Sequence, residues 1–458
     1  MADDKEIDVE QQPLLTTAKS SKKSSDEDYS AADVDKIRNF LGTSYMMAMG
    51  VCGVVLTAIG STLDEIATNC GTTSTAVGTV FIARGAGAVA GALVSAKLYS
   101  PPTKGNTVMM STMFVLTGLL MYIPFLTSVV ALHIVFCGLG FCTAVTDTGC
   151  QIMTRKVQGV QAGPWLGANT VVFGVAGALV PLVDIITTDL FTMYATLSTV
   201  TVITLVSLLA LPHPENPGIA KYLPAKLNKG VGKSRAVDEY ISKYYVTEMI
   251  IGSMVFWFIG GKVLCSSYIE DYVVDSGVIP GSQKEWALMC VWVFIAVGRF
   301  AGLHDQIRLN RMGVKGIHPL YTSLCLWIGT GIVGGAVIFA FQSSSTAFWA
   351  SMVLYGFGNG PCVGYCYDLN NRLTEATEMG MSIVMFGLNF GASIVPYVAT
   401  ILWDDTALSY HVVPVCLFVS MICPLPFLYL TRPLNNVSSI GMDEDDVKKP
   451  SRASEESA

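Results

Sequence analysis

Ionisable side chains in otherwise apolar stretches are the first feature of this sequence that could do chemistry. Asp147 lies in the apolar stretch 128–153, with Thr143 and Gln151 four residues to either side of it. This spacing places the three side chains on one face of a helix. A charged group at the centre of a membrane helix costs about 2.5–3.5 kcal/mol on insertion scales. Asp147 therefore either binds a cation or a ligand hydroxyl, or forms a structural ion pair near a helix end.

Two cations and several polar side chains occupy comparable positions. Arg84 lies near the middle of the stretch 75–97 and either pairs with a carboxylate in the same part of the chain or contacts a ligand. Lys262 lies within 246–268, where its ammonium either reaches the membrane surface or faces a ligand. Amides and aromatic rings in apolar stretches either hold helices together or bind a ligand. The candidates of this kind are Asn169, Asn359, Asn389 and Trp257.

A second group of charges lies towards the ends of apolar stretches in the second half of the chain. Its members are Arg299, Asp305, Arg308, Arg311, Asp368 and Arg372. Asp368 and Arg372 are four residues apart, so they can pair on one helix. Charges at helix ends can hold neighbouring segments together, and we expect this group to form a gate rather than a ligand site.

The elements that carry these residues are twelve apolar stretches, each about long enough to cross a bilayer. A hydrocarbon core of ~30 Å needs roughly 20 apolar residues in a helix. The stretches are 40–62, 75–97, 107–126, 128–153, 163–183, 190–211, 246–268, 286–303, 319–341, 347–370, 379–402 and 410–430. We therefore expect an all-α integral membrane protein with twelve transmembrane helices.

Basic residues are distributed unequally between the two sides of this arrangement. Arg84, Lys262 and Arg299 fall within spans, and Lys284 falls in an outer loop. The other 24 of the 28 Lys and Arg residues fall in the tails and loops of the opposite side. Because cytoplasmic loops carry an excess of Lys and Arg, both tails and the segment 212–245 are predicted to be cytosolic.

The amino-acid composition also indicates an integral membrane protein. Charged residues make up 14% of the 458-residue chain and hydrophobic residues 52%, whereas soluble domains carry about 25% charged residues. The basic residues are spread over many short loops, so we expect no nucleic-acid partner. Eleven of the twelve cysteines lie in apolar spans, where they fit as small buried hydrophobes. Cys362 and Cys366 have no His or carboxylate at ligand spacing, so we expect neither a metal nor another cofactor.

Polar segments divide the chain into five parts. The tails 1–38 and 433–458 are rich in serine, lysine and acidic residues and are expected to be disordered. The proline-containing basic segment 212–245 is a linker between two six-helix bundles, 39–211 and 246–432.

The N-terminal tail contains a candidate sorting signal. Glu10-Gln-Gln-Pro-Leu14-Leu15 matches the acidic dileucine pattern that adaptor proteins read for endosomal, lysosomal or vacuolar sorting. Such six-residue patterns also occur by chance. The plasma membrane and these internal membranes are therefore both open as locations.

The two bundles carry related sequences, as parallel six-helix repeats should. FCGLGFCTAVTD at 136–147 is similar to LYGFGNGPCVGY at 354–365. GANTVVFGVAGALVP at 167–181 is similar to GMSIVMFGLNFGASIVP at 380–396. Because small residues let membrane helices approach closely, the shared glycines first indicate helix packing.

This organisation resembles the major facilitator superfamily of secondary transporters over about residues 40–432. TDTGCQIM at 146–153 and FGVAGALVPLV at 173–183 look like the branch that includes sodium-dependent glucose transporter-like proteins and, more remotely, fucose permease-like sugar carriers. FIAVGRFAG at 294–302 is also similar to that branch. One departure is Ser95, which stands where the superfamily's loop motif after its second helix has an aspartate.

The resemblance implies transport of a small polar solute, foremost a sugar, by alternating access of the two bundles. It implies symport with a proton or a sodium ion, or transport without a coupling ion, and it places Asp147 on a helix that lines the cavity. The alternatives are a carrier of another organic solute, or a sensor or scaffold on the same fold, which the altered loop motif would fit. We expect no enzyme and no ATP drive, because the chain lacks a GxxxxGK[ST] loop and its five histidines assemble no catalytic constellation.

Overall fold

The computed structural model describes residues 31–72, 77, 79–101, 104–159, 162–187, 189–215, 244–311, 318–374, 377–405 and 408–439. This part of the chain folds into helices and their connections, with no strand among the described residues. The sorting-signal candidate with Glu10, Leu14 and Leu15 lies outside the described residues, as do linker residues 216–243.

Six long helices form the first half. They are α1 (Ala31–Ser61), which is followed by the short α2 (Leu63–Asn69), then α4 (Val80–Leu98), α5 (Gly105–Tyr122) with the turn η1 (Ile123–Phe125), α6 (Val129–Gln158), α7 (Ala162–Ile186) and α8 (Leu190–Leu209). Each matches one predicted span. The start of α8 is fixed by Asp189, whose carboxylate accepts a hydrogen bond of 2.9 Å from the Thr192 backbone N–H. This bond and one from the Thr192 hydroxyl lower the pKa of Asp189.

The second half repeats this pattern. It comprises α11 (Val246–Ser276), the turn η3 (Gly281–Gln283), α12 (Lys284–Arg311), α13 (His318–Ala340), α14 (Ser345–Leu373), α15 (Glu378–Asp405), the turn η4 (Ser409–His411), α16 (Val412–Ile422) and α17 (Pro424–Ser439). The last predicted span is interrupted at Cys423, directly before Pro424, because proline has no backbone N–H to continue the helical hydrogen bonds.

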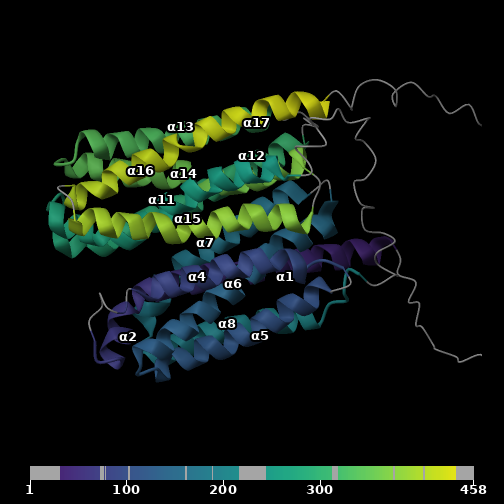
Figure 1. Cartoon of the computed structure of the whole chain (residues 1–458), viewed down its shortest axis with the longest axis horizontal. Helices are drawn as coiled ribbons and strands as arrows, with labels where there is room; N and C mark the ends of the chain where they lie inside the picture. Colours follow the sequence, from purple (N-terminus) through teal and green to yellow (C-terminus); the bar gives the residue numbers. More distant parts are fainter. Residues whose placement is uncertain are drawn as a thin grey trace, which may run out of the picture.

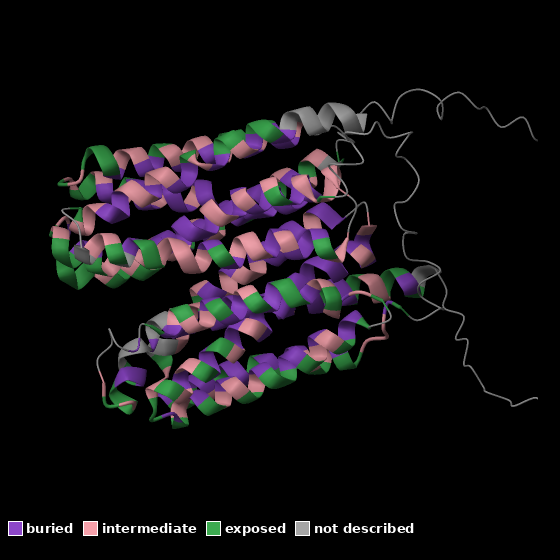
Figure 2. Ribbon diagram, in the orientation of Figure 1, coloured by how far each residue is buried: buried purple, intermediate pink, exposed green. Residues whose placement is uncertain are grey.

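The described helices can cross a membrane. Eleven of them, with η4, α16 and α17 counted as one segment, are long and apolar enough to do so. The twelfth long helix, α14, has 29 residues but carries Asn359, Asp368, Asn370 and Arg372, which lower its hydropathy. Large apolar side chains cover the outside: Phe114 is 70% exposed and Leu326 67%. Figure 2 shows exposed residues along the outer flanks of both bundles, as expected for surfaces that contact lipid.

The two halves lie side by side as separate bundles (Figure 1). They meet where α4 packs on α15 and where α7 packs on α12 and α14. The beginning of α1 and the end of α17 lie at the same end of the molecule, which we call the terminal end. The layout is the predicted one of twelve transmembrane helices in two six-helix bundles.

Equivalent helix pairs use glycine for close approach in both halves. A Cβ at Gly140 of α6 would collide with the backbone carbonyl of Arg84 in α4. A Cβ at Gly298 of α12 would collide with the carbonyl of Phe357 in α14. Four residues after Phe357, Pro361 cannot donate the helical hydrogen bond to this carbonyl, which leaves it free to face the neighbouring helix.

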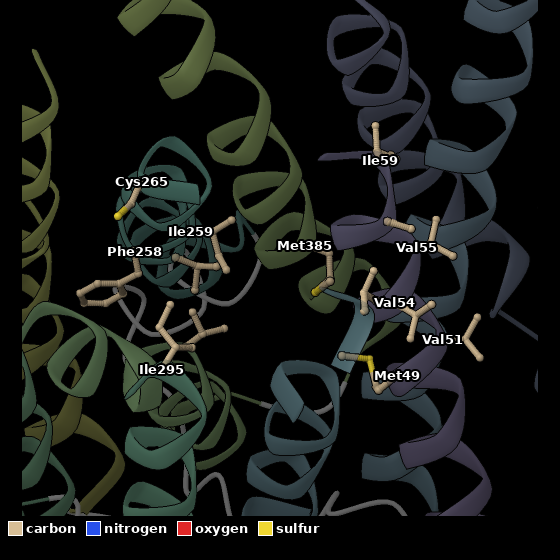
Figure 3. Close-up of a cluster of buried hydrophobic side chains, with 14 of the residues drawn as sticks. Met49, Val51, Val54, Val55, Ile59, Phe258, Ile259, Cys265, Ile295 and Met385 are labelled. Carbon is tan, nitrogen blue, oxygen red and sulfur yellow. The ribbon is translucent and has the colours of Figure 1, made fainter. Parts of the chain in front are cut away.

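One apolar cluster extends through both halves. Figure 3 shows Val54 and Val55 of α1 in the first half and Phe258 of α11, Ile295 of α12 and Met385 of α15 in the second.

Candidate functional site

A cavity lies between the two halves, and its walls come from both. Helices α1, α4, α6 and α7 of the first half line it together with α11, α12, α14 and α15 of the second. Most of the lining is apolar, with Phe173, Trp292 and Tyr367 contributing aromatic rings. A concave, mainly apolar site with a few polar groups is the usual form of a small-molecule site.

Four charged residues line this cavity. They are Arg84 of α4, Asp147 of α6, Lys262 of α11 and Arg299 of α12. Lys262 is only 2% exposed, Arg299 3% and Asp147 7%, while Arg84 is half-buried. The four come from four helices and from both halves, so the fold brings together charges that lie far apart in the sequence.

Arg299 joins the two halves directly. Its Nη1 donates a hydrogen bond to the backbone carbonyl of Thr170 on α7, and its guanidinium lies 5.3 Å from the centre of the Phe173 ring. Its Nε is buried and has no hydrogen-bond partner among the described residues. The sequence suggested a gate at a helix end for Arg299, whereas the fold places it in the wall of the cavity.

Asp147 is held by its own helix. Gln151 donates a hydrogen bond of 3.4 Å from Nε2 to a carboxylate oxygen of Asp147. Thr143, one turn earlier, also lines the cavity, and its hydroxyl donates to the carbonyl of Leu139 at 2.8 Å. Gln151 lies behind this surface, where it also contacts the Met49 sulfur. The predicted polar face therefore presents Thr143 and Asp147 to the cavity, while Gln151 supports the carboxylate.

The two remaining cations each have a nitrogen that no described residue pairs with. Nζ of Lys262 and Nε of Arg84 are buried without a hydrogen-bond partner among the described residues. The sequence left two alternatives for Lys262, an ammonium that reaches the membrane surface or one that faces a ligand. The buried position of its side chain in the cavity wall excludes the first. Arg84 forms no ion pair with a described carboxylate of its own half and faces the cavity instead.

The predicted amides and Trp257 are divided between the cavity and the helix contacts. Asn389 of α15 lines the cavity and donates to the Met385 carbonyl at 2.9 Å. Asn169 donates to the Thr154 hydroxyl at 3.1 Å, and Asn359 to the Phe258 carbonyl at 3.1 Å; neither lines the cavity. Trp257 packs against Phe256, with ring centres 5.2 Å apart, and is also absent from the lining.

Near the terminal end, paired charges connect the halves. Lys156 at the end of α6 forms an ion pair of 2.8 Å with Glu378 at the start of α15. The neighbouring Arg155 is buried and donates a hydrogen bond of 3.3 Å to the carbonyl of Tyr367 in α14. We call these contacts the terminal junction. Sequence reasoning did not single out these residues, because charges at the ends of membrane helices are common.

The other predicted gate residues lie on the last turns of α12 and α14. Asp305 accepts hydrogen bonds of 2.6 Å from Ser323 and of 2.6 Å from Tyr365, both in its own half. Asp368 pairs with Arg372 on α14 at 3.1 Å. A Cβ at Gly163 of α7 would lie 2.5 Å from an Asp368 carboxylate oxygen, so Asp368 contacts the opposite half closely. Arg308 and Arg311 are both exposed on the last turns of α12.

Comparison with protein families identifies the fold. The family model described as Major Facilitator Superfamily matches residues 43–396. The chain belongs to the major facilitator superfamily. The superfamily resemblance inferred from the sequence is thus confirmed. A comparison with curated protein sequences gave no match.

Solved structures of this superfamily share the fold at low sequence identity. The proton:xylose symporter XylE, bound to 6-bromo-6-deoxy-D-glucose, superposes with a TM-score of 0.71 at 11% identity, covering 89% of this chain and 99% of its own. The transporter FucP in its outward conformation gives 0.62 at 13% identity, with 85% and 99% covered. The human organic anion transporter MFSD10 gives 0.63 at 11% identity, with 86% and 99% covered. At these identities the likeness establishes the fold alone.

Proposed function

We propose that this protein is a secondary transporter that moves a small polar solute through the cavity by alternating access. The observation that carries the proposal is the cavity itself, which takes charged groups from both halves. A solute bound there contacts both bundles at once, so rocking of one bundle against the other can open the site first to one side and then to the other. Binding would then shift the populations of the two states according to their affinities.

We propose a sugar or sugar derivative as the solute and Asp147 as the site of a coupling cation, a proton or a sodium ion. The similarity of TDTGCQIM (146–153) to sugar carriers supports the solute class. The fold is shared with a proton:xylose symporter, which agrees with symport. A buried carboxylate next to Thr143 is chemically suited to either ion.

A sensor or scaffold on the same fold is the alternative function. The altered loop motif at Ser95 favours it. The buried cavity charges argue for transport, since a scaffold has no need to retain Asp147 and Lys262 in one cavity at the cost of desolvating both.

We propose that the terminal end faces the cytosol, because the basic residues predict it. Cysteines introduced at Ser276, at the end of α11, and at Ser234, in the linker, test this with an impermeant thiol reagent on intact cells. We expect labelling of Ser276→Cys at once and of Ser234→Cys only after permeabilisation, each compared with the parent chain. The reverse pattern would invert the orientation.

Uptake by liposomes that hold the purified protein tests transport itself. The panel contains labelled sugars, nucleosides and amino acids, each with and without proton and sodium gradients. We expect saturable uptake of a sugar-type solute and its accumulation with one of the two gradients. No protein-dependent uptake of any solute would favour the sensor or scaffold.

A further inference from the structure

We propose that the transported solute is an anion: a small hydroxylated molecule with a carboxylate or phosphate group. This inference rests on the proposed transport function and adds the charge of its substrate. It starts from the balance of charges in the cavity, where Arg84, Lys262 and Arg299 face a single described carboxylate, Asp147.

The charges of the cavity do not cancel internally. Asp147 attracts Arg299, but the two make no direct ion pair among the described residues, and Arg299 binds the Thr170 carbonyl instead. Lys262 and Arg299 repel each other. Buried charges are normally paired, because an unpaired charge in a low dielectric is costly. We therefore expect an anion to bind in the cavity and to pair with these cations.

This positive excess does not depend on the protonation of Lys262. A guanidinium stays charged in proteins, so the two arginines alone outnumber the one carboxylate. If Asp147 binds a proton or a sodium ion as proposed, the excess increases. Cation binding at Asp147 and anion binding beside it would then favour each other, which is one way to couple the binding of the two.

The cations come from both halves of the protein, and this arrangement also fits an anion. Arg84 belongs to α4 of the first half, whereas Lys262 and Arg299 belong to α11 and α12 of the second. A planar carboxylate or a phosphate can accept several charge-assisted hydrogen bonds at once, and arginine presents a fork of donors that matches either group. One anionic group can therefore bind cations of both bundles, while Thr143 and Asn389 remain for hydroxyl groups.

A neutral sugar fits this site less well. Its hydroxyls can accept hydrogen bonds from the cations but cannot compensate their charges. The solute group that best matches the described lining therefore carries at least one negative charge.

The test measures competition and uptake in liposomes that hold the full-length protein. The probes are glucose and xylose as neutral sugars, glucuronate as a carboxylate, glucose 6-phosphate as a phosphate, and lactate as a carboxylate with one hydroxyl. We expect glucuronate or glucose 6-phosphate to be taken up at concentrations about 10-fold or more below those needed for glucose. The comparison of the two decides between carboxylate and phosphate.

Substitutions of the cavity cations test whether the preference for anions arises in the cavity. Arg84→Gln and Lys262→Met remove one charge each and should lower apparent affinity for the anion about 10-fold or more, with less effect on any neutral-sugar uptake. Lys97→Gln is the matched control, since Lys97 is an exposed cation near the end of the same helix as Arg84. It should behave as the parent protein.

The outcomes separate this inference from the proposed function. Saturable uptake of neutral sugars with no uptake of, or competition by, any anion overturns the charge assignment and leaves the transport function standing. Anion uptake that Arg84→Gln and Lys262→Met leave unchanged overturns the assignment of the site. Absence of uptake for every probe contradicts the transport function itself.

Discussion

The cavity and the terminal junction differ in whether a cation is paired directly with a carboxylate. In the cavity, Arg84 and Lys262 leave buried nitrogen atoms without a hydrogen-bond partner in the described structure. At the terminal junction, Lys156 and Glu378 pair at 2.8 Å, and Arg155 donates a hydrogen bond to a carbonyl of the opposite half. Both regions connect the same two bundles, but among the described residues only the junction contains an ion pair between them, Lys156 with Glu378. Arg155 beside it still has Nε and Nη1 buried without a partner in the described part of the chain.

This difference indicates separate roles. A satisfied ion pair between the halves stabilises one arrangement and must break when the halves move apart. An unsatisfied group of cations costs stability in every state until a ligand arrives, and its persistence is best explained by binding. The junction should therefore set the resting conformation, while the cavity sets what is bound.

The largest effect is expected at Asp147. Asp147→Asn removes the one described carboxylate of the cavity and should abolish accumulation driven by a proton or sodium gradient. Exchange of solute at equal concentrations should persist, because solute binding does not need the coupling ion to move. Liposome uptake with and without each gradient measures both. Unchanged accumulation would leave Asp147 with a structural role alone.

A large effect is also expected at Arg299, which lines the cavity and also bonds across the two halves. Arg299→Met removes a cavity cation and the bond to the Thr170 carbonyl, which together represent ~2–3 kcal/mol, or a loss of roughly 30- to 150-fold in uptake at low solute concentration. Arg299→Lys keeps the charge but not the fork of donors, so its loss should be intermediate. Equal losses for both variants would show that the fork, and not the charge, is what matters.

Breaking the terminal junction should have a smaller effect. Lys156 and Glu378 are partly exposed, and such a pair is worth about 0–1 kcal/mol, or up to roughly fivefold in a population ratio. Lys156→Gln should therefore speed alkylation of a cysteine placed at Thr154 by no more than that factor. Exchanging the two residues, Lys156→Glu with Glu378→Lys, should restore the slow rate. A double variant as reactive as Lys156→Gln would argue against a pairwise contact.

The smallest effect is expected for the predicted gate residues at the ends of α12 and α14. Asp305 has its hydrogen-bond partners in its own half, and Asp368 pairs with Arg372 on one helix. Neutralising Asp305, Asp368 and Arg372 together should still increase reactivity at Thr154→Cys, because Asp368 lies against α7. The increase should be below that of Lys156→Gln. No change at all would limit these residues to the local folding of helix ends.

The architecture was accessible from sequence because it depends on few variables. Bilayer thickness sets the length of each helix. The distribution of basic residues indicates which loops share a side of the membrane and therefore how many spans lie between them. The cost of burying charge also pointed to Asp147, Arg84 and Lys262, all of which line the cavity. These features need no knowledge of how one helix is rotated against another.

The rest of the site depends on that rotation. Asn359 and Asn389 look alike in sequence, but only Asn389 faces the cavity, while Asn359 donates to a carbonyl of α11. Arg299 lies close enough to a helix end to suggest a gate, and the packing of α12 on α7 places it in the cavity instead. Lys156 and Glu378 were missed because their pairing depends on two helix ends that are 222 residues apart in the chain.

The polar character of α14 has a consequence for how the protein enters the membrane. A helix with Asn359, Asp368, Asn370 and Arg372 partitions poorly into lipid by itself. The helices on which α14 packs include α7, α11, α12 and α13, all of which precede it in the chain. Asn359 finds its carbonyl acceptor on α11, so the acceptor is synthesised before the amide that needs it. Insertion of α14 is thus coupled to assembly with helices already present, and the order of the helices along the chain makes that coupling possible during synthesis.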